Sequence, residues 1–188
     1  MRALALDPLS IDLIRRFLVM KKQKGFSLIE LLIVVAIILI IAAIAIPNLL
    51  RSRMAANEAS AVGSLRTINT AQVTYSSTFG VGYTNLASLS TPAAGCPGTG
   101  GTAAAACLVD TVLGAGTKSG YKITSVATGG AGTVLSPFVA FTSTAIPVSV
   151  GQSGQRSFCS DESGVIRYDP TGAAPAPPCG TTGLNPLQ

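Results

Sequence analysis

Glu30 is a lone carboxylate in a strongly apolar stretch of this sequence. It and Ser27 are the only polar side chains between Phe26 and Ile46. A carboxylate inside a membrane segment costs a few kcal/mol and usually has a partner and a function. If the chain were cut after Gly25, Phe26 would gain a free amine, and that amine could pair with the Glu30 carboxylate of a neighbouring copy. The chemistry that these residues predict is therefore charge pairing between copies of the chain.

The segment that positions Glu30 is long enough to cross a membrane. At 1.5 Å per residue, a helix over residues 26–46 spans the hydrocarbon core of a bilayer. Lys21, Lys22 and Lys24 stand just before it, so the N-terminus is expected in the cytoplasm and the C-terminal part outside.

Three interpretations of this segment compete. It could be a plain anchor, in which Glu30 merely reaches the headgroups, or a secretory signal peptide cut after the small residues Ala43-Ile44-Ala45. In the third, a basic leader is removed and the apolar helix is kept. A plain anchor has no use for Glu30, and signal peptides have a shorter apolar region of about 7–15 residues. We therefore favour the third.

Residues 24–38, with the sequence KGFSLIELLIVVAII, resemble the N-terminal motif of type IV pilins and pseudopilins. The resemblance implies that a prepilin peptidase cuts between Gly25 and Phe26, and that Phe26 becomes an N-methylated N-terminus. It also implies that Glu30 sets the register of assembly. Pro47 matches the helix-bending proline of the family and is expected to kink the helix.

Residues 1–25 form the expected leader, which is longer than is usual in this family. Met20 begins a leader of the familiar size. We therefore expect translation to start at Met20 and residues 1–19 to be a mis-assigned extension upstream of the true start. A genuine long leader is the alternative.

The chain beyond the apolar run predicts one long helix whose second half is amphipathic. Apolar residues recur at heptad spacing after Pro47, so a continuous helix is expected over residues 26–79. Residues 26–46 would be its membrane and assembly segment, and residues 47–79 its amphipathic half. Glu58 and Gln72 interrupt this stripe. Gly80 and Gly82 are expected to end the helix. The stripe consists of Met54, Ala61, Leu65, Ile68, Tyr75 and Phe79.

Residues 80–188 predict a globular head with an antiparallel sheet. Apolar and β-branched runs indicate strands at residues 121–126, 138–142, 156–160 and 165–168, the last two joined by a hairpin turn at residues 161–164. Turn-forming residues dominate Thr91–Ala106, which is expected to be a loop. The predicted fold class is α+β, the type IV pilin fold that the resemblance implies, with a long N-terminal helix on three to four strands.

The four cysteines all follow the apolar segment. An even count in an exported region predicts disulfides, and the spacing does not match zinc sites of the C-x-x-C kind. Three pairings are open. We favour Cys96–Cys107 and Cys159–Cys179 because each closes a local segment rich in Pro and Gly. The second pair would also resemble the disulfide-bounded C-terminal loop of pilins.

Composition argues against catalysis and nucleic-acid binding. The chain has no His, the commonest general base and metal ligand, and no arrangement of Ser with Lys stands out. Of the net charge of +5, the leader carries +4 and the rest of the chain only +1. The basic residues after the leader are scattered, so no basic groove for nucleic acid is predicted. Asp161 and Glu162 are expected to be solvated turn residues, with calcium binding the lesser alternative. We therefore expect no enzyme, no metal and no cofactor.

The function predicted from these features is that of a structural filament subunit. The chain would be a prepilin with its head outside the inner membrane and would polymerise into an extracellular type IV pilus that supports motility and adhesion. Its expected partners are further copies of itself, minor pilins, the prepilin peptidase and methylase, and the inner-membrane assembly platform. A pseudopilin of a type II secretion system is the alternative.

Overall fold

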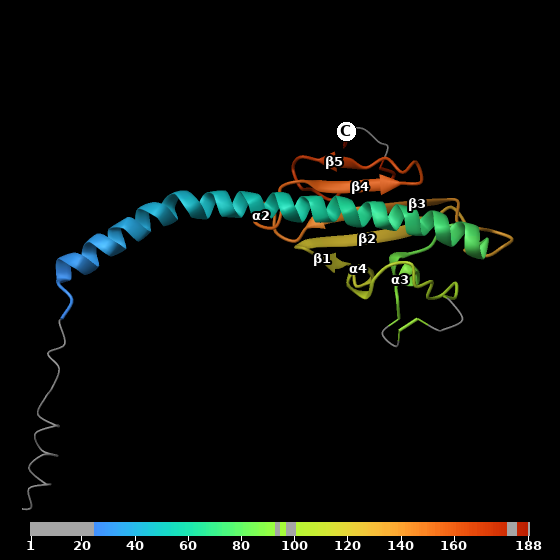
Figure 1. Cartoon of the computed structure of the whole chain (residues 1–188). Helices are drawn as coiled ribbons and strands as arrows, with labels where there is room; N and C mark the ends of the chain where they lie inside the picture. Colours follow the sequence, from blue (N-terminus) through green and yellow to red (C-terminus); the bar gives the residue numbers. More distant parts are fainter. Residues whose placement is uncertain (1–24, 93–94, 97–100, 180–183, 188) are drawn as a thin grey trace, which may run out of the picture. The chain divides into compact units, whose positions relative to one another are not determined.

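The computed structural model describes residues 25–92, 95–96, 101–179 and 184–187 (Figure 1). Most of the expected leader, with Met20, lies outside these residues. The chain divides into two units, residues 1–45 and 46–188. Helix α2 (Leu28–Phe79) begins in the first unit and ends in the second.

The predicted long helix is confirmed. α2 runs for 52 residues and includes Pro47. It ends at Gly80, whose φ of +67° lies in the left-handed region and whose N–H donates to the Ser76 carbonyl oxygen at 3.1 Å. Gly82 follows with a φ of +81°, and a Cβ there would collide with the Phe138 backbone. Glycine therefore both stops the helix and lets the chain pass close to the sheet.

The head contains a sheet of antiparallel strands against which the second half of α2 packs (Figure 1). The sheet has six strands among the described residues, in the order β1-β2-β3-β4-β5-β6. The predicted α+β class is confirmed, but the predicted count of three to four strands is wrong. The strands are β1 (Thr117–Lys118), β2 (Tyr121–Thr128), β3 (Ala140–Pro147), β4 (Ser157–Asp161), β5 (Arg167–Asp169) and β6 (Asn185–Pro186).

The strand β3 lies further along the chain than expected. It was predicted at residues 138–142 but spans Ala140–Pro147, where alternate residues are buried. One of the buried residues is Ser143, whose hydroxyl donates to the Ser125 hydroxyl of β2 at 2.9 Å. The buried face of β3 is thus partly polar. For this reason the alternation of buried and more exposed residues along the strand does not appear as an alternation of apolar and polar residues in the sequence.

The core of the head forms between α2 and the sheet. Four of the six stripe residues of α2 are buried, and Phe79 packs against the core from a partly buried position. From the sheet, the Tyr121 and Phe158 rings approach each other with centroids 6.0 Å apart. The buried stripe residues are Ala61, Leu65, Ile68 and Tyr75.

Two short helices flank the region predicted as a loop. α3 (Leu86–Leu89) precedes it and α4 (Thr111–Gly114) follows it. Asp110 caps α4 by accepting a hydrogen bond from the Leu113 N–H at 2.6 Å. In the described part of residues 91–106 the backbone forms an isolated bridge between Thr102 and Ala105 but no regular helix or strand.

Candidate functional site

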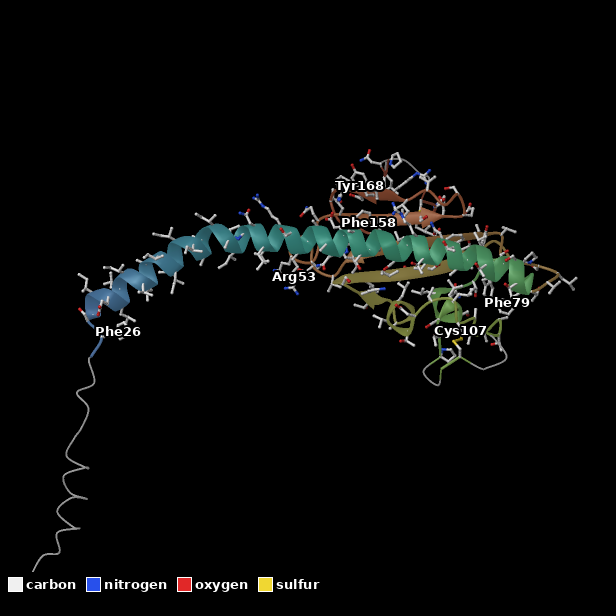
Figure 2. All side chains as sticks on the ribbon, in the orientation of Figure 1. Phe26, Arg53, Phe79, Cys107, Phe158 and Tyr168 are labelled. Carbon is white, nitrogen blue, oxygen red and sulfur yellow. A yellow bond between two sulfur atoms is a disulfide. The ribbon has the colours of Figure 1, made fainter. Side chains whose placement is uncertain are left out.

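The Gly25–Phe26 junction lies in exposed, non-helical backbone just before α2. Phe26 is 83% exposed, and Figure 2 shows its side chain at the start of the helix. A Cβ at Gly25 would meet nothing within 4 Å. The junction thus has the accessible, irregular backbone that a protease needs in order to bind a peptide bond in its active site.

Glu30 lies in the first turn of α2. Its carboxylate Oε2 accepts a hydrogen bond from the backbone N–H of Ser27, which immediately precedes the helix, at 3.0 Å. Ser27 and Glu30 have the spacing of a capping box, in which the third helical residue binds the N–H of the N-cap residue. The charge also lies where the helix dipole favours an anion. The Ser-x-x-Glu pattern was visible in the sequence, but the sequence interpretation overlooked it.

The residues after Glu30 form an apolar helical surface that the rest of the described chain leaves uncovered. Within α2 an 18-residue window has a mean hydropathy of 3.3 and none of it is buried. By length and composition this helix could cross a membrane. The large exposed side chains after Glu30 are Leu31, Leu32, Ile33, Val34, Val35, Ile37, Ile38, Leu39, Ile40, Ile41, Ile44, Ile46, Leu49 and Leu50.

Pro47 lies inside α2 and does not end it. Proline removes one intrahelical hydrogen bond and its ring presses on the preceding turn, which locally weakens a helix. The boundary between the two units falls next to it, after Ala45. A kink at Pro47 stays a prediction.

Glu58 is a buried charge that connects α2 to the end of the loop between β3 and β4. It is only 8% exposed. Its Oε1 accepts hydrogen bonds from the backbone N–H groups of Gln155 and Arg156, at 2.9 and 3.1 Å, and its Oε2 lies 2.7 Å from the Arg156 guanidinium. Burial by itself would raise the pKa of Glu58, but these hydrogen bonds and the Arg156 charge outweigh it and hold the pKa below its ordinary value.

Arg156 is itself held by aromatic rings. Its guanidinium lies 5.6 Å from the centroid of the Phe158 ring and 5.2 Å from that of Tyr168. Its backbone carbonyl oxygen accepts a hydrogen bond from the Tyr121 hydroxyl at 2.7 Å. Burial first, and then the nearby Glu58 charge, raise the pKa of Tyr121, so its hydroxyl stays protonated and continues to donate.

Gln72 makes a second polar connection inside the head. Its amide nitrogen donates to the Thr84 carbonyl oxygen at 2.5 Å and to the Ser125 hydroxyl at 3.0 Å, and its amide oxygen accepts from the Thr84 N–H at 2.9 Å. The sequence interpretation treated Glu58 and Gln72 as interruptions of the apolar stripe. Both are buried and hydrogen-bonded, and they fix the rotation and axial position of α2 against the sheet.

Replacing Glu58 should make the stability of the head less dependent on pH. Because the pKa of Glu58 is lower in the folded state, its contribution is complete above about pH 4.5 and is lost as the pH falls through the folded pKa. Since Arg156 is 41% exposed, solvent weakens the pair. We expect Glu58→Gln to cost about 1–2 kcal/mol at pH 7, or roughly 2–8 °C in Tm.

The measurement is thermal unfolding of the detergent-solubilised full chain from pH 7 down to about pH 3. The difference between wild type and Glu58→Gln should shrink below about pH 4.5. Glu162→Gln, which removes an exposed carboxylate, is the matched control and should follow the wild type. An unchanged difference across the whole range would contradict the role of the Glu58 charge.

The cysteines are joined in the pairing that the sequence favoured. Cys96 bonds to Cys107, with Cα atoms 6.0 Å apart, and Cys159 bonds to Cys179, with Cα atoms 5.7 Å apart. Cys159 lies on β4 and both it and Cys179 are fully buried. The second bridge therefore ties the tail after β5 to the centre of the sheet.

The acidic turn between β4 and β5 differs from the expectation in one residue. Glu162 is exposed, as predicted, but Asp161 is buried. Its carboxylate accepts hydrogen bonds from the N–H and hydroxyl of Ser163, at 3.1 and 2.5 Å, and lies 3.7 Å from the Arg167 guanidinium. Asp161 is thus a structural residue of the turn. Within the described residues, no three His, Cys, Asp or Glu side chains gather as a metal site would require.

Comparison with known proteins connects the N-terminal part of the chain to pilins. A family model described as the prokaryotic N-terminal methylation motif matches residues 20–46. The chain is 64% identical over 39 residues to the type IV wide pilus major component PilA4 of Thermus thermophilus, and 46% identical over 54 residues to the type IV major pilin protein PilA of Myxococcus xanthus.

These matches are confined to a short part of each protein. They cover 21% and 29% of this chain, and 30% and 24% of PilA4 and PilA respectively. The chain thus matches less than a third of the length of either relative. No solved structure matches it.

Proposed function

We propose that this chain, whose N-terminal motif and similarity to two type IV pilins support membership of the type IV pilin family, is a structural subunit of a type IV pilus. One observation carries the proposal. An exposed peptide junction at Gly25–Phe26 is followed at once by a helix with an uncovered apolar surface and a carboxylate in its first turn. Such a helix needs other hydrophobic partners, first lipid and then copies of itself.

Processing would create the charge that Glu30 needs. Cleavage after Gly25 converts the Phe26 amide nitrogen into an amine, which N-methylation leaves cationic. The Glu30 carboxylate already points to the N-terminal end of α2, where it accepts from the Ser27 N–H. The Phe26 amine of a neighbouring copy could pair with this carboxylate at the N-terminal end of α2. Burying the amine and the carboxylate together is far less costly than burying either group alone.

Outside the membrane, packing between copies would keep the apolar surface away from water. Exposure of that surface to water would cost about 25 cal/mol per Å², but covering it does not specify register. The Phe26–Glu30 pair would do so, because a subunit displaced along the helix leaves both charges unpaired. Hydrophobic packing therefore holds the copies together outside the membrane, and the pair selects one arrangement.

The proposal includes a path from the inner membrane to the outside. The precursor would sit in the inner membrane with its N-terminus in the cytoplasm and its head outside, where a prepilin peptidase and methylase act on it. An assembly platform would then move it into a filament with minor pilins, and that filament would support motility and adhesion. A pseudopilin of a type II secretion system remains the second candidate, because it shares the N-terminal motif.

Mass spectrometry of the mature protein tests the proposal. We expect an N-terminus at Phe26 carrying one methyl group, and long filaments in electron micrographs of material sheared from the cell surface. Short or absent filaments at native expression, with the same N-terminus, would favour the pseudopilin. A mature chain that begins at Ile46 would show that the apolar helix is discarded, and would overturn both candidates.

A further inference from the structure

The head has two ends that are set by the topology of its sheet. The β2–β3 loop, residues 129–139, and the β4–β5 turn lie at one end, because Thr128 pairs with Ala140 and Asp161 pairs with Thr142. The backbone bridge between Gly82 and Phe138 places this end beside the C-terminus of α2. We call it the distal end.

The β3–β4 loop, residues 148–156, lies at the opposite end. It follows Pro147, which pairs with Tyr121 at the start of β2. The Asn57 side-chain amide of α2 donates to the Ser153 carbonyl oxygen of this loop at 2.8 Å. We call this the proximal end, and Figure 2 shows Arg53 and Phe79 toward the proximal and distal ends of the head respectively.

The distal end presents two apolar side chains and one acidic side chain to solvent. Val134 and Leu135 occupy the middle of a tight turn, in which the Ser136 N–H donates to the Thr133 carbonyl oxygen at 3.1 Å. Leu135 is 98% exposed. Glu162 is exposed on the β4–β5 turn at the same end, and has no ion pair with any described residue.

The proximal end has a groove with the complementary character. The groove has a volume of about 540 Å³ and includes Arg53, Asn57, Ser119, Val148 and Gln152 in its lining. Val148 is 66% exposed, which gives the groove an apolar surface. Arg53 is exposed and, within the described part of the chain, forms no ion pair.

We propose that the distal end of one copy docks into the proximal groove of the next. In this contact Val134 and Leu135 pack against Val148, and the Glu162 carboxylate faces the Arg53 guanidinium. The two surfaces are different, so the contact is heterologous and repeats from copy to copy into an open filament. The inference rests on the proposed function and adds to it a contact between heads that does not involve Glu30.

Charge reversal tests whether Glu162 and Arg53 meet. Arg53→Glu and Glu162→Arg alone each place like charges in the contact, which is costly across an interface. Each is expected to lower the yield of sheared filaments by about tenfold. The double variant restores opposite charges with the positions exchanged, and its yield should return to within about twofold of the wild type. Lys122→Glu is the control, because it reverses an exposed charge of β2 outside the groove lining and should leave the yield unchanged.

A photo-reactive residue provides a readout that does not depend on yield. p-Benzoylphenylalanine in place of Leu135 should leave the fold intact, since this side chain is almost fully exposed. Irradiated filaments should contain a cross-link from residue 135 to the peptide that includes Val148. A cross-link to another part of the neighbouring copy would overturn the contact. So would a double variant whose filament yield is no better than that of the worse single variant. In both cases wild-type filaments would still support the proposed function. If the wild type forms no filaments, the proposed function is contradicted, and the proposed contact between heads is contradicted with it.

Discussion

Glu30→Gln is expected to be processed normally at Gly25–Phe26 but to assemble at least about 100-fold less filament than the wild type. Glutamine keeps an oxygen that can accept the Ser27 N–H, so the helix start is preserved, but the negative charge is gone. The Phe26 amine of the neighbouring copy would then be buried without a counter-charge. Removing one member of a buried pair costs about 3–5 kcal/mol, and each 1.4 kcal/mol is a factor of ten. The measurement is the ratio of filamentous to membrane-bound mature protein.

Comparison with Glu30→Ala separates the capping of α2, which the structure shows, from the charge pairing that we propose. If capping of α2 were its essential contribution, glutamine would assemble and alanine would not. If charge pairing is essential, the two variants fail to a similar extent, and this is the result we expect. Full assembly of Glu30→Gln would remove the charge pair from the mechanism.

The long helix could be predicted because its signals are local. The apolar run, the heptad-spaced stripe and the terminal glycines each lie within a few residues of the structure that they determine. The residues proposed for processing and assembly could be suggested for the same reason, since Gly25, Phe26 and Glu30 lie within one short motif. The pairing of the cysteines also followed from closeness in sequence, because each bridge closes a short loop.

The sheet was harder to predict because some of its buried residues are polar. Ser125 and Ser143 face each other across β2 and β3 and satisfy each other by hydrogen bonding, so burying them is not costly. A method that looks for apolar alternation places such residues at the surface. The terminal strands β1 and β6 have two residues each, too few for any periodicity to appear.

The connection between Glu58 and Arg156 could not have been found from local patterns. The two residues are separated by 98 positions, and the partner of Glu58 becomes defined only when the sheet has formed. What the sequence did offer was a charged residue in an otherwise apolar stripe. A buried charge is tolerated only with partners, so such a residue should have been taken as evidence for a distant cation.

Replacing Gly25 with a bulky residue is expected to stop processing. For Gly25→Leu we expect the rate of leader removal to fall by about 100-fold or more, because a peptidase site shaped around glycine has no room for a branched side chain. The uncut precursor should then accumulate in the membrane and form no filaments. Intact-mass analysis of the membrane fraction measures the ratio of precursor to mature chain.

The structure makes this variant a clean probe of cleavage. Apart from its neighbours in the chain, a Cβ at Gly25 would meet nothing within 4 Å, so the leucine itself should not perturb α2 or the head. Formation of the Cys159–Cys179 bridge reports whether the head has folded, because this bridge is buried in the head. It should form in the Gly25→Leu precursor and in the wild type alike. Gly25→Ala, with the smallest added side chain, should be processed far better than Gly25→Leu. Equal processing of the two would show that the peptidase does not select for size at this position, and the expected cleavage site would have to be placed elsewhere.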